Sequence, residues 1–90
     1  MNTDLLQKLV AELLETGIYK TTAQVVEEFR TENADCWEQL KKEGEMLYGT
    51  SCSSVQQPST RISQILLSLP ADLCLRRIEN GEYFWSKPVA

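Results

Sequence analysis

The residue types on which most enzyme chemistry depends are scarce in this chain, which has no histidine at all. Without histidine, a serine or cysteine nucleophile cannot be activated by an imidazole, and imidazole acid–base catalysis is excluded. A phosphate-binding P-loop and a dinucleotide fingerprint are also missing, because the four glycines stand apart at Gly17, Gly44, Gly49 and Gly81. We therefore predict a protein that is not an enzyme and uses no cofactor.

The carboxylates and the thiols offer little further chemistry. The acidic pairs Glu27–Glu28, Asp35–Glu38 and Glu43–Glu45 are typical of solvated helix faces. Three cysteines are too few for a four-cysteine zinc site, and their long spacings and odd number speak against a disulfide framework; they are Cys36, Cys52 and Cys74. The sequence predicts no metal site, incidental thiols and a reducing, cytoplasmic location.

Length and charge limit the class of partner. Ninety residues, 42% of them hydrophobic, predict a single domain over 1–90, and no apolar run is long enough for a membrane helix. The first apolar run is interrupted by Asp4, Lys8 and Glu12, unlike a signal peptide. The net charge of −4 opposes strong non-specific nucleic-acid binding, but the excess of acid lies in residues 1–48. A local binding face in the second half is therefore still possible.

Hydrophobic periodicity predicts four helices. Leucines at helical spacing indicate a helix over 4–16 that ends near Gly17, and the capping-box pair Thr21 and Gln24 starts a second over 22–30. Asn33 is expected to cap a third helix, which ends near Gly49. A Ser-rich loop over 50–58 then precedes a fourth helix over 59–69, capped by Ser59 and stopped by Pro70. The expected core is Leu6, Leu9, Leu13, Val25, Phe29, Trp37, Leu40, Ile62, Ile65, Leu66 and Leu69.

The C-terminal segment carries a hairpin signal. Asn80-Gly81 suits a two-residue type I′ turn, because both central residues of that turn need positive φ. Strands over 73–79 and 82–86 would then pair Glu79 with Glu82, Ile78 with Tyr83, Arg77 with Phe84 and Arg76 with Trp85. Both faces of this hairpin mix apolar and cationic side chains, so the pattern leaves open which one is buried. Ile18 and Tyr19 suggest a further minimal strand. The predicted fold class is mainly α with a C-terminal β-hairpin.

The helix over 59–69 followed by the hairpin over 73–86 resembles a winged-helix domain, in which a recognition helix precedes a two-stranded wing. The resemblance implies that the helix enters the major groove of DNA while the wing touches the backbone. Its implied nucleic-acid-binding residues are Ser59, Thr60, Arg61, Ser63, Gln64 and Ser68 on the helix, with Arg76, Arg77 and Lys87 as wing cations. The connection over 49–58 is longer than the usual turn between such helices. The second and third helices have a short turn, but the third is acidic.

A protein-binding alternative is kept beside the DNA-binding hypothesis. Arg76 could stack on Trp85 and Arg77 on Phe84 as cation–π pairs rather than bind phosphate. Leu67 on the outer side of the fourth helix also suits a protein partner better than a phosphate backbone. The alternative function is a protein-interaction or dimerisation module with the same fold, using exposed side chains among Leu67, Tyr83, Phe84 and Trp85.

Overall fold

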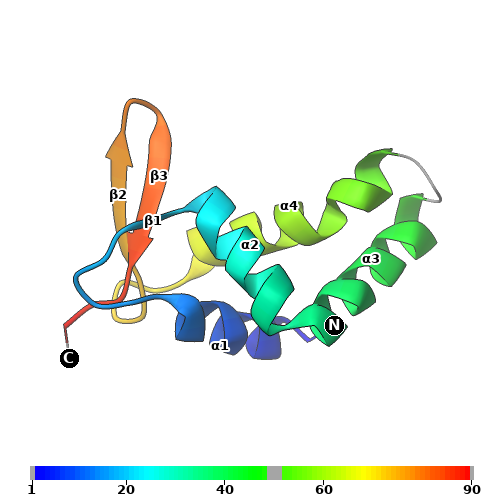
Figure 1. Cartoon of the computed structure of the whole chain (residues 1–90), viewed down its shortest axis with the longest axis horizontal. Helices are drawn as coiled ribbons and strands as arrows, with labels where there is room; N and C mark the ends of the chain where they lie inside the picture. Colours follow the sequence, from blue (N-terminus) through cyan, green and yellow to red (C-terminus); the bar gives the residue numbers. More distant parts are fainter. Residues whose placement is uncertain (1, 49–51, 90) are drawn as a thin grey trace.

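The computed structural model describes residues 2–48 and 52–89, with side chains described outside 47–57. Four helices are followed by a hairpin, and one short strand lies between the first two helices (Figure 1). The elements are α1 (Thr3–Leu13), β1 (Lys20–Thr21), α2 (Thr22–Glu32), α3 (Ala34–Tyr48), α4 (Cys52–Ser68), β2 (Leu75–Glu79) and β3 (Glu82–Ser86). The predicted class, mostly helical with a C-terminal hairpin, is confirmed at this coarse level.

The first two helices begin at side-chain caps. Asn2 caps α1 by accepting hydrogen bonds from the amides of Asp4 (2.7 Å) and Leu5 (3.4 Å). The predicted end of this helix near residue 16 is wrong, because α1 stops at Leu13 and Gly17, with φ of +79°, serves the turn that follows. The capping box of α2 is confirmed: Thr21 Oγ1 accepts from the Gln24 amide at 3.1 Å.

Helix α4 differs most from the sequence-based expectation. It begins at Cys52, so the predicted loop is wrong over 52–58, and Ser59 lies inside the helix instead of capping it. Residues 50 and 51 of that predicted loop lie outside the described part of the chain. Pro58 is buried and lies within α4. The helix continues through it, although proline has no N–H and one helical hydrogen bond is missing there. Helix α4 lies alongside α3 (Figure 1), and its Ser-rich start is helical although the helix propensity of that segment is weak.

The hairpin joins a third strand to make an antiparallel sheet in the order β1-β3-β2. Its predicted register is confirmed at all four pairs, from Arg76–Trp85 to Glu79–Glu82. Asn80 and Gly81 have φ of 51° and 79°, the positive values that the turn requires. The additional strand is Lys20–Thr21, two residues later than Ile18–Tyr19, and it pairs Lys20 with Trp85.

A hydrophobic core joins the helices to the base of the sheet. Of the side chains expected to be buried, Leu9, Leu13, Trp37 and Leu69 are only partly so; the others have relative exposures of 4% or less. Four further residues complete this core, namely Val10, Leu14, Cys74 and Trp85. Cys74 and Trp85 lie on the same face of the hairpin, and their burial shows that this face is turned toward the helices. Ile78, on the same face but nearer the tip, stays 56% exposed.

Candidate interaction surface

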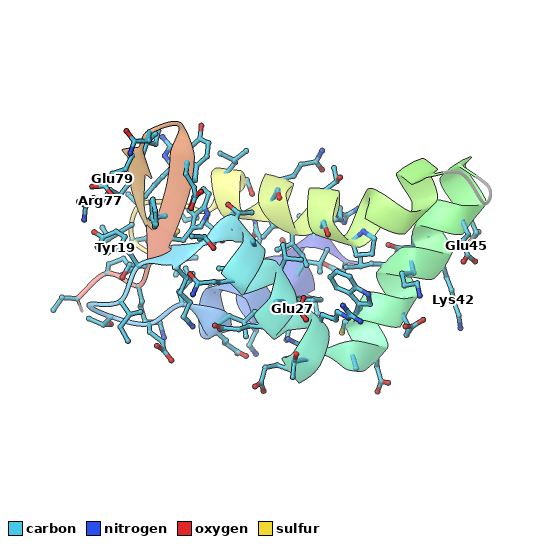
Figure 2. The ribbon with its side chains drawn as sticks, turned by 45° about the horizontal axis from the view of Figure 1, so that its top comes forward. Tyr19, Glu27, Lys42, Glu45, Arg77 and Glu79 are labelled. Carbon is cyan, nitrogen blue, oxygen red and sulfur yellow. The ribbon has the colours of Figure 1, made fainter. Side chains whose placement is uncertain are left out.

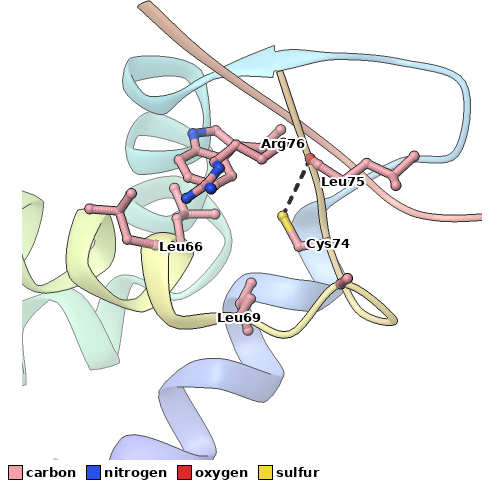
Figure 3. A pocket seen from close by; sticks show the side chains of 8 residues that line it. Leu66, Leu69, Cys74, Leu75 and Arg76 are labelled. Carbon is pink, nitrogen blue, oxygen red and sulfur yellow. Dashed lines mark hydrogen bonds between the residues drawn. The ribbon is translucent and has the colours of Figure 1, made fainter. Parts of the chain in front are cut away.

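A groove lies where the end of α4 meets the start of β2 (Figure 3). It has a volume of about 380 Å³ and is lined by Leu66, Leu67, Leu69, Ala71, Cys74, Leu75, Arg76 and Trp85. Most of these side chains are apolar, and Arg76 brings a guanidinium group to the groove (Figure 3). The groove therefore suits an apolar group with a nearby negative charge.

The thiol in this groove is not prepared for nucleophilic chemistry. Burial raises the pKa of Cys74, and this effect outweighs the opposing hydrogen bond from the Ser86 backbone and the charge of Arg76. The Cys74 Sγ lies 3.5 Å from the carbonyl oxygen of Leu75, to which the thiol donates. Since a raised pKa keeps the thiol protonated at neutral pH, Cys74 acts as a small buried apolar side chain.

Beside the groove, strand β2 forms an exposed edge of the sheet. All five of its residues are exposed, including Leu75 at 39% and Ile78 at 56%. On α4, Leu67 is 50% exposed and borders the same groove. Sequence periodicity did not single out Leu75 and Ile78 as surface candidates, because it could not show which strand of the hairpin becomes the edge. The groove and this β2 edge together present apolar side chains to solvent.

The hairpin arginines stack on rings other than those expected. The Arg76 guanidinium lies 5.9 Å from the centre of the Tyr83 ring, and that of Arg77 lies 5.7 Å from Tyr19. The predicted partners Trp85 and Phe84 are therefore wrong. Trp85 is buried, and the Tyr83 ring stacks on it with the ring centres 5.5 Å apart, so Arg76 meets the more exposed ring of the stacked pair. The pairing of β1 with β3 accounts for the second contact, because it carries the adjacent Tyr19 to the hairpin.

The two arginines do not form one cationic face. Successive residues of a strand point to opposite sides, so Arg76 and Arg77 diverge. Arg77 also forms an ion pair with Glu79 (Figure 2). Glu79 and Glu82 flank the turn, so the two strands taken together carry as many acidic as basic residues.

The side chains predicted on the fourth helix are spread around it. Thr60 and Gln64 are exposed on its outer side, whereas Ser59 and Ser63 are half-buried, and the Ser63 hydroxyl donates to the Ser59 carbonyl at 2.9 Å. Ser68 is exposed, and its hydroxyl donates to the Ile65 carbonyl oxygen at 2.8 Å.

The remaining predicted cations lie near α1. Arg61 reaches Thr3 Oγ1 at 3.5 Å, and Lys87 borders a hollow lined mainly by α1 residues. The structure thus places Arg76 and Arg77 on β2, and Arg61 and Lys87 beside α1.

Lys20 is a buried charge that the sequence did not reveal. Its ammonium group donates to the carbonyl oxygen of Leu13 at 2.6 Å and to Glu28 Oε1 at 2.7 Å, and Glu15 Oε1 lies 3.8 Å away. The carbonyl at the end of α1 is left without an intrahelical partner, and a cation there is favourable. Lys20 therefore joins α1, β1 and α2, and its role is structural.

Replacing Glu28 with glutamine is expected to lower the free energy of unfolding by about 1–3 kcal/mol, because the buried Lys20 ammonium loses its nearest charged partner. The double variant Lys20→Met/Glu28→Gln should lose less than the two single losses added, since it removes both charges. Urea unfolding of the four proteins checks this. Glu27→Gln, in an exposed pair with Arg30, is the matched control and should change stability by less than about 0.5 kcal/mol. Strict additivity would show that Lys20 and Glu28 do not interact.

In the part of the chain that the structure describes, no group of three or more acidic or cysteine side chains is placed to hold a metal ion. Among the described residues, no helix is long and apolar enough to cross a membrane. Comparison with protein-family models, with curated proteins and with solved structures gave no match for this chain. A functional proposal therefore depends on the surface alone.

Proposed function

We propose that this chain is a non-catalytic, winged-helix-like binding module whose partner is a protein. The observation that carries the proposal is the exposed edge of β2 beside an apolar groove. Leu67, Leu75 and Ile78 are each at least 39% exposed there. Leu67 and Leu75 both line the groove, and exposed apolar surface next to polar groups is typical of protein-interaction sites.

The charge of this region supports a protein partner over a phosphate backbone. Nucleic-acid binding needs several cations that neutralise phosphates together. Arg76 and Arg77 point to opposite sides of the sheet, and Arg77 is already paired with Glu79. An exposed strand edge offers instead a row of backbone hydrogen-bonding groups, which a peptide or another strand can extend.

DNA binding remains a second candidate because of one feature of the fold. The hairpin rises beside the C-terminal end of α4, as a wing stands beside a recognition helix, and Thr60 and Gln64 are exposed on that helix (Figure 1). Under this proposal α4 carries the base contacts and the hairpin arginines contact the backbone. It predicts that Gln64, on the outer side of α4, lies at the interface.

Site-specific photo-crosslinking in cells that make the whole chain distinguishes the two candidates. A photoreactive amino acid in place of Ile78 or Leu67 is expected to give protein adducts, because these side chains border the proposed interface. Gln39, exposed on α3, is the matched control position and should give none. Nucleic-acid adducts from Gln64, lost when Arg61, Arg76 and Arg77 are changed to glutamine, would establish the DNA-binding candidate instead. Absence of adducts at all three test positions would contradict both.

A further inference from the structure

The outer edge of β2 has backbone groups that no described element covers. The sheet order β1-β3-β2 places β2 at one end, and its only extensive contact with another element is the pairing with β3. All five of its residues are exposed. Edge strands of this kind bind further strands unless something prevents it.

The register shows which residues face the open edge. In a two-residue hairpin the pair that flanks the turn, here Glu79 and Glu82, is hydrogen-bonded, and the pairs alternate from there. This alternation predicts that the backbone groups of Lys87 point away from β2. The Lys87 amide does so, because it donates to the Glu15 carbonyl oxygen at 3.2 Å on the opposite side of β3. The N–H and C=O groups of Arg76 and Ile78 therefore point outward from β2.

We infer that β2 binds β2 of a second copy of this chain, antiparallel, with the two-fold axis at Ile78. The inference rests on the proposed function, since it names the protein partner. In this register Ile78 of each copy exchanges two backbone hydrogen bonds with its equivalent. Arg77 then lies opposite Glu79 of the partner subunit, and Glu79 opposite the partner subunit's Arg77. Both are pairs without backbone hydrogen bonds, in which side chains approach most closely.

Charge complementarity selects this register over its neighbours. A residue whose backbone N–H and C=O point outward can pair only with a residue of the other copy whose backbone groups also point outward. The two-fold axis must therefore pass through a residue of β2, and the alternative registers place it at neighbouring residues. An axis at Arg77 places the two Arg77 side chains opposite each other, and an axis at Arg76 or Glu79 opposes like charges in the same way. With the axis at Ile78, both charged pairs are attractive, and opposite charges facing across strands stabilise a sheet.

The geometry of the hairpin is compatible with this pairing. The hairpin projects beyond the helical body, and Ile78 lies two residues from the turn (Figure 1). A two-fold axis this close to the tip keeps the two helical bodies at opposite ends of the joint sheet. Arg77 and Glu79 lie together at the outer side of the hairpin, where they would exchange partners (Figure 2). Pairing of two copies would also cover the exposed Ile78 side chain.

Two complementary charge variants test the proposal by sedimentation equilibrium. Arg77→Glu makes positions 77 and 79 both acidic, and Glu79→Arg makes them both basic, so each variant alone opposes like charges at two pairs. Each should self-associate roughly tenfold or more weakly than the unaltered chain. An equimolar mixture should form heterodimers, because both pairs become attractive again. The same reversals in the exposed pair on α2, Arg30→Glu and Glu27→Arg, are the matched controls and should leave self-association unchanged.

A third variant tests the backbone ladder separately. Ile78→Pro removes an outward N–H that β3 does not use, so the hairpin should persist while self-association falls. Circular dichroism melting of each variant shows whether the fold is retained.

Self-pairing is overturned if the unaltered chain stays monomeric at millimolar concentration, or if the folded charge variants fail to associate on mixing. The proposed protein-binding function would still stand if Ile78 crosslinks to a different protein, and it falls only if the crosslinking experiment also fails.

Discussion

Replacing Phe29 with alanine is expected to lower the free energy of unfolding by about 3–5 kcal/mol. Phe29 lies on the inner side of α2, is fully buried and belongs to the core shared by the helices and the base of the sheet. Alanine removes most of a ring from closely packed surroundings and leaves a cavity that the helices cannot fully close. For a chain of this length such a loss is a large part of a total stability on the order of 5–13 kcal/mol.

Urea unfolding followed by circular dichroism measures this effect. Trp37→Ala is the informative comparison, because Trp37 is also a large aromatic side chain but is only partly buried against the core. It should lose less than Phe29→Ala, since part of its ring area is already in contact with water. Equal losses below about 1 kcal/mol at both positions would show that the core lies elsewhere.

Replacing Trp85 with alanine is expected to cost about 3–5 kcal/mol and to release the hairpin from the helices. Trp85 is 2% exposed at the base of β3. Its indole Nε1 donates to Thr22 Oγ1 at 2.9 Å, which ties the sheet to the first turn of α2. The same ring stacks on Tyr83, so its removal also takes away support along the strand.

Trp85→Phe separates packing from the hydrogen bond. Phenylalanine retains most of the buried area and loses the N–H donor, so the cost should be clearly smaller than that of alanine. Amide hydrogen exchange then locates the damage: in Trp85→Ala, protection should fall most over β2 and β3. Unchanged protection in the hairpin would mean that the sheet is held to the helices by other contacts.

Features that depend on neighbours in the chain were predictable from sequence. The Asn80-Gly81 turn needs only two residues that tolerate positive φ, and it determines the strand register by itself. The capping box of α2 is similarly local, because Thr21 and Gln24 bond each other's backbone. Helical spacing of apolar residues likewise identified most of the core, since each helix has one side that must leave water.

Features that depend on contacts between distant segments were not predictable. The start of α4 has poor intrinsic helix propensity and contains Pro58, and the contact of α4 with α3 is not visible in the local sequence. The pattern of the two-residue strand β1 is too short to place it, so the strand lies two residues later than expected, and its pairing with β3 makes β2 the open edge and brings Tyr19 to Arg77.

The candidate surface follows the same division. Residue types and hairpin register showed that Arg76, Arg77 and Ile78 share one strand, and these are properties of local sequence. Which strand lies at the edge, which face is buried and which ring each arginine meets were decided by the docking of the sheet on the helices. The physical reason is that turns and caps are satisfied by bonds within a few residues. Burial and edge position depend instead on packing between segments far apart in the chain, and a local pattern of residue types does not encode that packing.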